Sequence, residues 1–294
     1  MFIKRLPRFD YHTPTSIAEA LKLLSTYGKD AKLLAGGTDL VLAMKKRSVT
    51  PAHMINLKTV PGLSGITADA KGVTIGALTT IAEIERSAII KDVYTPIWDA
   101  ARVMASPQVR TLATIGGNMA SAVPSADMAP PLMVLSAEAT IVSPSGERTC
   151  PVQDIFAGPS QCSLTPTDII TSIRIPVPKG KGTYLKLMRR AALDLALVGV
   201  AAYVALDTKN VCTDVKIALG AVAPTPIRAQ GAEAVVLGKV LTEGLAAEAG
   251  KFSGTVCSPI SDVRASQGYR CSMVEVLTKR ALVQALNRSI QGGV

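Results

Sequence analysis

The sequence predicts an α+β protein built from more than one domain, and three observations carry that prediction. The chain has 294 residues, which exceeds a typical single domain. Strand-like segments follow one another in the last third, and helical segments then follow these strands. Strands grouped in this way favour antiparallel sheets covered by helices over one continuous doubly wound sheet. The strands are expected at residues 182–190, 195–206 and 211–222, and the helices near 229–237, 241–251 and 267–289.

The first expected unit, residues 1–57, is a small α/β domain. Ser16 precedes a helical pattern and Glu19 follows three residues later, which is the spacing of a capping box. Gly28 stands where this helix would end. A short buried strand over 31–36, a helix over 38–47 that ends in cations, and a strand over 53–57 complete the unit.

The second expected unit, residues 58–177, begins with a hairpin that turns between Asp69 and Gly72. Helices are expected near 80–90 and 95–104, and strands at 139–146 and 168–178. The prolines that close the last strand suggest a boundary near residue 177, so that residues 178–294 form the third unit.

The long helix expected in the third unit has two patterns of its own. Val274, Leu277, Ala281 and Ala285 recur at helical spacing and should form the face that packs on the core. Glu275 and Lys279 have the i,i+4 spacing of an ion pair.

The charge balance is strongly basic, with 32 Lys and Arg residues against 22 Asp and Glu residues. Nucleic-acid binding is one interpretation, but the basic residues are dispersed into short groups such as residues 45–47 and 189–190, and aromatic residues do not interleave them. A solvated basic surface that could face an acidic partner subunit or an anionic cofactor is the favoured interpretation.

Cysteine and histidine usage argues against a metal site in this chain. The five cysteines are scattered without a CxxC pair, and the only histidines are His12 and His53. Structural zinc and protein-bound iron–sulfur sites need clustered ligands. The N-terminal segment lacks the apolar region of an export signal, and the longest apolar run, residues 195–206, is too short to span a bilayer. We therefore expect a cytoplasmic protein with no membrane span.

Two glycine pairs, in "AGGTDL" (35–40) and "TIGGN" (114–118), are the candidate functional motifs. Successive backbone N–H groups in a glycine turn can form a concave anion-binding nest, and a helix N-terminus favours the same charge. Two such nests could close on one diphosphate. Asp39 could cap the following helix or accept a hydrogen bond from a ribose or ring N–H. A single glycine pair is, however, also typical of an ordinary tight turn.

The known fingerprints do not resolve this choice. The sequence contains no G-x-G-x-x-G, no P-loop motif and no G-x-S-x-G elbow. A Ser-His-Asp site could use only His12 or His53, and each is better interpreted as a surface or core histidine.

Four segments together resemble one family. The segments "LLAGGTDL" (33–40), "TIGGNMASAVPSADMAPPL" (114–132), "DIITSIRIP" (168–176) and "SQGYRCSMVEVLTKRAL" (266–282) occur in its order and spacing. They resemble the FAD-binding medium subunit of molybdenum hydroxylases, the family of the carbon monoxide dehydrogenase and xanthine dehydrogenase flavoprotein subunits. The resemblance implies a two-part N-terminal FAD-binding domain of the vanillyl-alcohol-oxidase or PCMH type, and a C-terminal domain of antiparallel sheet with helices.

The resemblance also implies which residues hold FAD. The first glycine segment would wrap the diphosphate, the second would form another diphosphate loop, and two polar residues beyond it would touch the cofactor. Met104 and Ile170 match residues that pack near the adenine or the ring system, and Lys186 matches a lysine close to the flavin. The implied set is Leu33, Leu34, Ala35, Gly36, Gly37, Thr38, Asp39, Leu40, Met104, Thr114, Ile115, Gly116, Gly117, Asn118, Ser121, Asp127, Ile170 and Lys186.

The function implied by the resemblance is electron transfer. Substrate would be hydroxylated at a molybdenum–pterin centre on a large subunit, and electrons would pass through two [2Fe–2S] clusters on a small subunit to FAD in this chain. An external acceptor would then take them. The complex would be a dimer of heterotrimers. No catalytic side chain and no metal ligand is expected here, because the flavin supplies the redox chemistry.

Two alternatives remain open at this stage. The chain could be a free-standing FAD-dependent oxidase or dehydrogenase with its own small substrate, although it offers no large substrate domain. It could also be an assembly subunit with a vacant cofactor site.

Overall fold

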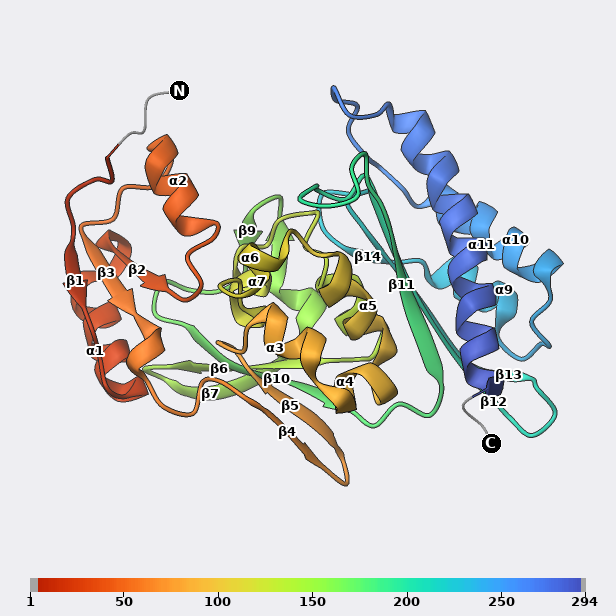
Figure 1. Ribbon diagram of the computed structural model, residues 1–294, viewed down its shortest axis with the longest axis horizontal. Coiled ribbons are helices and arrows are strands. Elements are labelled where there is room, and N and C mark those ends of the chain that lie inside the picture. Colours follow the sequence, from red (N-terminus) through yellow and green to blue (C-terminus); the bar gives the residue numbers. More distant parts are fainter. Residues whose placement is uncertain (1–4, 292–294) are drawn as a thin grey trace.

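The computed structural model describes residues 5–291, in which three larger sheets follow one another in sequence order along the molecule and a two-stranded pair forms a fourth, small sheet (Figure 1). The first is a parallel three-stranded sheet of order β1-β3-β2. Helix α1 packs its buried Ala20 and Leu24 on this sheet, and α2 follows the second strand. The elements are β1 (Asp10–His12), α1 (Ile17–Tyr27), β2 (Ala31–Leu34), α2 (Leu40–Lys46) and β3 (His53–Asn56).

The middle sheet is antiparallel, with the strand order β4-β5-β10-β6-β7. Six short helices lie between this sheet and the C-terminal sheet: α7 packs on β5 and β10, whereas α5 and α8 pack on strands of the C-terminal sheet. The largest hydrophobic core of the molecule lies among these helices and the two sheets. The elements of this middle unit are β4 (Ile66–Asp69), β5 (Gly72–Gly76), α3 (Ile81–Arg86), α4 (Ala88–Val93), α5 (Thr95–Val103), α6 (Pro107–Arg110), α7 (Ile115–Ala120), α8 (Ala129–Val134), β6 (Glu138–Ser143), β7 (Gly146–Pro151), the small pair β8 (Phe156–Gly158) and β9 (Gln161–Cys162), and β10 (Ile169–Pro176).

The third sheet is antiparallel in the order β11-β12-β13-β14, as the grouped strands of the sequence predict. Its central strand β12 is buried along nearly its whole length, and helix α11 packs the face Val274, Leu277, Ala281 and Ala285 on the sheet. The elements are β11 (Lys181–Leu187), β12 (Val198–Leu206), β13 (Cys212–Gly220), β14 (Ile227–Arg228), α9 (Gln230–Val236), α10 (Glu243–Thr255) and α11 (Gln267–Gln291).

Each sheet draws its strands from one of the three expected units, while the boundaries at 57/58 and 177/178 stay predictions. The helix expected near 80–90 is two helices, because Ser87 has an extended backbone that ends α3, and its side chain caps α4. None of the helices within residues 5–291 has the length and apolar character needed to cross a membrane. The cytoplasmic location stays a prediction.

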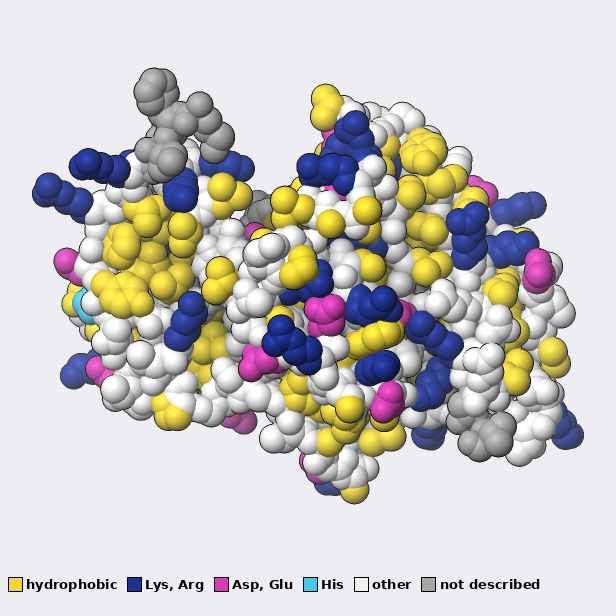
Figure 2. All heavy atoms as spheres, viewed as in Figure 1, with side chains coloured by type: hydrophobic (Ala, Val, Ile, Leu, Met, Phe, Trp, Pro, Cys, Tyr) yellow, Lys and Arg dark blue, Asp and Glu magenta, His cyan; other side chains and the backbone are white. Residues whose placement is uncertain are grey.

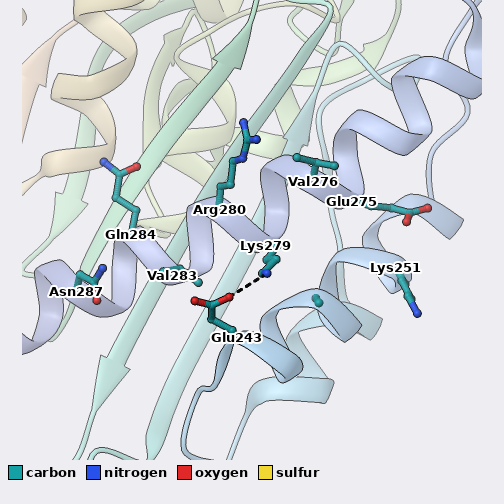
Figure 3. Close-up of a pocket in the computed structure, with 10 residues that line it drawn as sticks. Glu243, Lys251, Glu275, Val276, Lys279, Arg280, Val283, Gln284 and Asn287 are labelled. Carbon is teal, nitrogen blue, oxygen red and sulfur yellow. Dashed lines mark ion pairs between the residues drawn. The ribbon is translucent and has the colours of Figure 1, made fainter.

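Two local predictions need correction. Glu19 does not return to the backbone of Ser16: its carboxylate accepts from the N–H and hydroxyl of Thr15, and only the Ser16 half of the capping box forms. Lys279 does not pair with Glu275. Its ammonium lies 3.1 Å from the Glu243 carboxylate, because α10 packs beside α11 and brings that charge closer (Figure 3).

The basic side chains are scattered over the face shown in Figure 2, where acidic and apolar side chains interrupt them. This distribution differs from the continuous stripe that would track a nucleic-acid backbone. It supports the interpretation of a solvated basic surface.

Candidate functional site

The first glycine loop connects β2 to α2 and presents open backbone donors. Gly37 has φ of +74°, a left-handed conformation that favours glycine. Within residues 5–291, no acceptor takes up the N–H groups of Gly36, Gly37, Thr38 or Asp39. Consecutive unpaired amides in a turn form the kind of concavity that binds an anion. These four amides are therefore free to bind a ligand, and the anion-binding nest expected at this motif stays a prediction.

The second glycine turn uses its donors inside the protein. The N–H groups of Ile115 and Gly116 donate to the Thr79 and Ala77 carbonyls at 3.1 and 2.9 Å. The N–H of Gly117 donates to Thr114 Oγ1, at the N-cap of α7, at 3.1 Å. The N–H of Asn118 continues this helix by donating to the Thr114 carbonyl at 3.0 Å. The expectation of a second open nest is therefore wrong for these amides, because the segment before α3 accepts from the first two and Thr114 accepts from the other two.

The glycines of both motifs allow close packing between segments. A Cβ on Gly36 would lie 2.0 Å from the Leu112 carbonyl oxygen, just before the second motif. A Cβ on Gly116 would lie 2.7 Å from that of Ala77. Gly36 therefore also serves the contact between the two motifs, which the sequence pattern did not distinguish from ligand binding.

A side-chain hydrogen bond joins the two motifs directly. Ser121 Oγ donates to Asp39 Oδ2 at 2.7 Å, although the residues are 82 positions apart. Asp39 occupies the N-cap position of α2 but makes no capping hydrogen bond with its side chain, so the capping role considered for it is wrong. The structure thus brings the two expected diphosphate loops into direct contact, and their sharing of one diphosphate stays a prediction.

Asp127 and Lys186 form a buried ion pair beyond the second motif. Lys186 Nζ donates to Asp127 Oδ2 at 2.8 Å and to the Val103 carbonyl at 3.3 Å, and the lysine side chain is 1% exposed. The Tyr184 hydroxyl donates to Asp127 Oδ1 at 2.8 Å. Burial raises the pKa of Asp127, while Lys186 and Tyr184 oppose that rise; burial also holds the pKa of Tyr184 well above its usual range.

The remaining candidates connect or support these groups. The Asn118 side chain accepts from the Met128 N–H at 3.3 Å, which holds the segment carrying Asp127 against α7. Met104 is half-buried, and its carbonyl accepts from Arg110. Ile170 lies on β10 within the core and is 7% exposed. Three half-buried side chains lie at the end of β2, those of Leu33, Leu34 and Ala35. At the start of α2 lie Thr38 and Leu40. The side chain of Ile115 is part of the hydrophobic core around the middle sheet. Contact of any of these residues with a cofactor stays a prediction.

Three residues that shape the site were missed in the sequence. Tyr184 precedes Lys186 by two residues, which places both on one face of a strand, so strand periodicity could have found it. Thr80 forms a complete capping box with Glu83 and a bridge to Thr114, and its S/T-x-x-E spacing was a readable signal. Ala77 receives Gly116 through tertiary packing, for which the sequence gives no local signal.

The histidines lie on the neighbouring strands β1 and β3, and His53 pairs with Ala31 at the end of β2 that is remote from the first glycine loop. His12 Nε2 and His53 Nδ1 are 3.1 Å apart, and Tyr27 stacks on His53 with ring centroids at 3.6 Å. Both histidines thus have structural partners. Among residues 5–291, no three His, Cys, Asp or Glu side chains gather as metal ligands would.

Comparison with known proteins covers nearly the whole chain. Residues 7–178 match the family described as FAD binding domain in molybdopterin dehydrogenase, and residues 183–285 match the CO dehydrogenase flavoprotein C-terminal domain. The carbon monoxide dehydrogenase medium chain of Hydrogenophaga pseudoflava is 35% identical over 283 residues, which cover 96% of this chain and 98% of that protein. The xanthine dehydrogenase FAD-binding subunit of Escherichia coli O157:H7 is 31% identical over 281 residues, or 94% and 95% of the two chains.

Solved structures agree with the sequence relatives. The fold superposes with a TM-score of 0.93 on a chain of carbon monoxide dehydrogenase from Hydrogenophaga pseudoflava, at 35% identity over 97% of this chain and 99% of that one. A chain of quinoline 2-oxidoreductase from Pseudomonas putida 86 gives a TM-score of 0.91 at 28% identity, over 97% and 99% of the two chains. The expected α+β fold, with an N-terminal FAD-binding domain and a C-terminal domain of antiparallel sheet and helices, is confirmed. The chain belongs to the family of FAD-binding medium subunits of molybdenum hydroxylases, oxidoreductases related to carbon monoxide dehydrogenase and xanthine dehydrogenase.

Proposed function

We propose that this subunit holds FAD with its diphosphate against the Gly36–Asp39 amides and transfers electrons from [2Fe–2S] clusters of a partner to an external acceptor. The observation that carries the proposal is the run of unpaired N–H donors at Gly36, Gly37, Thr38 and Asp39. These donors fit a dianionic diphosphate without needing a cationic side chain, and the Thr38 hydroxyl adds a donor beside them.

The second motif would form the opposite wall of the same site. Its amides are engaged internally, so Asn118 and Ser121 would contribute through their side chains and through the shape of the turn. The buried pair of Asp127 and Lys186 would position this wall against the C-terminal sheet, and Met104 and Ile170 would supply apolar contacts. Bound FAD supplies reversible electron transfer, and the protein orients it and controls solvent access. No side chain of this chain acts as an acid or base on the organic substrate.

The proposed partners are a large molybdopterin-binding subunit and a small [2Fe–2S] subunit, assembled as a dimer of heterotrimers. Support comes from the relatives that are medium chains, which this chain matches almost end to end. Native mass spectrometry of the co-expressed subunits tests this composition.

An anaerobic mixing experiment tests the electron path. The FAD-loaded chain is mixed with its [2Fe–2S] partner, which has been reduced and freed of excess reductant. Flavin absorbance should bleach within the mixing time course, and an external acceptor should restore it. Absence of bound flavin, or flavin that stays oxidised beside the reduced partner, would contradict the proposal. Substrate turnover by the isolated chain would instead favour the free-standing oxidase.

A further inference from the structure

Helices α10 and α11 approach each other closely in an antiparallel arrangement (Figure 3). Near the start of α10, Glu243 pairs with Lys279. Near its end, a Cβ on Gly254 would lie 2.8 Å from the Glu275 side chain, and one on Gly250 would lie 2.5 Å from the Glu275 carbonyl oxygen. Residues later in α10 therefore contact residues earlier in α11.

The next contact along this seam brings two cysteines together. Cys257 lies about one turn beyond Gly254, just after α10 ends, and Cys271 lies one turn before Glu275. The two thiols are neighbours, both side chains are half-buried, and the Cys257 thiol also donates to the Ser253 carbonyl at 3.2 Å. The proposed electron-transfer function uses neither cysteine.

We propose that Cys257 and Cys271 form a reversible disulfide when the protein meets hydrogen peroxide, joining the end of α10 to the second turn of α11. The Cys271 thiolate attacks one peroxide oxygen and the O–O bond breaks, which yields a sulfenic acid and a hydroxide that becomes water. Cys257 then attacks the Cys271 sulfur, the S–S bond forms and the S–O bond breaks, releasing a second water. Two thiols lose two electrons in total, and these reduce one peroxide.

The two cysteines have different roles in this two-step oxidation. Burial, with the neighbouring Cys271 thiol adding to it, raises the pKa of Cys257 to about 12, so this thiol is a poor first nucleophile at neutral pH. Cys271, in the second turn of helix α11, is the other thiol of the pair. Cys271 is therefore the attacking thiol and Cys257 the resolving thiol, and the high pKa of Cys257 makes closure slow.

The disulfide would restrain the segment between the cysteines. Residues 258–266 are held mainly by polar contacts, in which Arg264 and Arg270 bind Asp262 at 2.6 and 2.9 Å. Ile260 and Val263 of this segment are 68% and 97% exposed. A covalent link across its ends should raise the protection of its amides and the melting temperature of the domain.

Peptide mapping of the whole FAD-loaded protein tests the proposal. The protein is treated with hydrogen peroxide, its remaining thiols are alkylated, and trypsin digestion follows without reduction. Trypsin separates the cysteines into peptides 252–264 and 271–279. We expect these two peptides as one cross-linked species that dithiothreitol releases. Oxidised protein should also melt several degrees higher than reduced protein.

Serine variants test which thiol attacks the peroxide and which one resolves the sulfenic acid. Cys257→Ser should leave a sulfenic acid on Cys271 that dimedone labels, whereas Cys271→Ser should leave Cys257 unlabelled. Cys162→Ser, which changes a half-buried cysteine on β9, should not alter the cross-link. The proposal is overturned if peroxide oxidises Cys271 in the wild-type protein without yielding the 252–264/271–279 pair. It is also overturned if the pair forms equally in urea-unfolded protein, since the folded seam would then not be responsible.

Discussion

The two glycine motifs have similar sequences, but the protein uses their backbones in opposite ways. In the first, the N–H groups from Gly36 to Asp39 have no acceptor within residues 5–291. In the second, the N–H groups from Ile115 to Asn118 all donate to groups of the middle unit. The first motif is therefore open for a ligand, and the second is already part of the fold.

This difference assigns separate tasks to the two motifs. Unpaired donors cost free energy unless water or a ligand satisfies them, so the first loop gains most from an anion. The second turn is held by Ala77, Thr79 and Thr114 and is anchored further through Asp127, so it can act as a fixed wall. The hydrogen bond between Ser121 and Asp39 aligns the open loop with that wall.

The largest contrast is expected between Gly36→Ala and Gly117→Ala. A Cβ at Gly36 would lie 2.0 Å from a backbone oxygen, so the two motifs must separate. We expect this variant to lose FAD and roughly 2 kcal/mol or more of its free energy of unfolding. The Cβ at Gly117 would meet only the Thr114 hydroxyl, at 2.8 Å, and a helical alanine offsets part of a weakened cap, so the change should stay within about 1 kcal/mol.

Flavin-to-protein ratio and thermal melts of the apo proteins measure both changes. If Gly117→Ala lost as much flavin as Gly36→Ala, the second turn would be a direct ligand for the diphosphate. The distinction between the two motifs would then fail.

Asp127→Asn should destabilise the folded protein around the second glycine motif. The change leaves the Lys186 ammonium buried without a charged partner, which typically costs about 3–5 kcal/mol. Chemical denaturation of the apo protein measures this loss, and Asp127→Asn/Lys186→Met should recover much of it. A loss of flavin affinity with unchanged stability would instead place Asp127 among the cofactor's direct partners.

Hydrogen exchange tests the contrast between open and engaged amides without any substitution. At FAD a hundred times its Kd, the Gly36–Asp39 amides should gain protection on the order of 100-fold. The Ile115–Asn118 amides should be protected already in the apo protein, because their acceptors belong to the fold. Equal gains at both motifs would show that the second turn also forms only around the cofactor.

Much of this architecture was predictable from local sequence. The strand β12 follows from a long apolar run, and the position of Gly28 at the end of α1 follows from its freedom to adopt φ of +51°. The candidate site was predictable in outline, because the first glycine pair directly precedes α2 and the second lies in the first turn of α7. These signals depend on neighbours in the chain, which a sequence displays directly.

The features that the sequence did not show depend on distant partners. Lys279 has a carboxylate four residues before it, yet it pairs with Glu243 on the adjacent helix α10. Asp39 resembles a helix cap but binds Ser121, 82 residues away. The amides of Ile115 and Gly116 look free in the sequence, but they donate to the carbonyls of Thr79 and Ala77, which only the fold brings near them. Each outcome was decided by which segments meet in the fold.

The smallest expected effect concerns the charge on the open loop itself. Asp39→Asn keeps an oxygen that can accept from Ser121 Oγ, so the two motifs should stay joined. It removes an exposed carboxylate from the loop proposed to hold a diphosphate, and we expect FAD to bind a few-fold more tightly at low ionic strength, about 0.5–1 kcal/mol. Fluorescence titration measures this affinity, and added salt should reduce the gain.

Ser121→Ala serves as the matched control for Asp39→Asn. It breaks the hydrogen bond between Ser121 and Asp39 that Asp39→Asn keeps, leaves the charge unchanged, and should weaken FAD binding. Weaker FAD binding by Asp39→Asn would mean that the carboxylate accepts a hydrogen bond from the cofactor, and the open loop would then recognise FAD through this side chain as well as through its backbone.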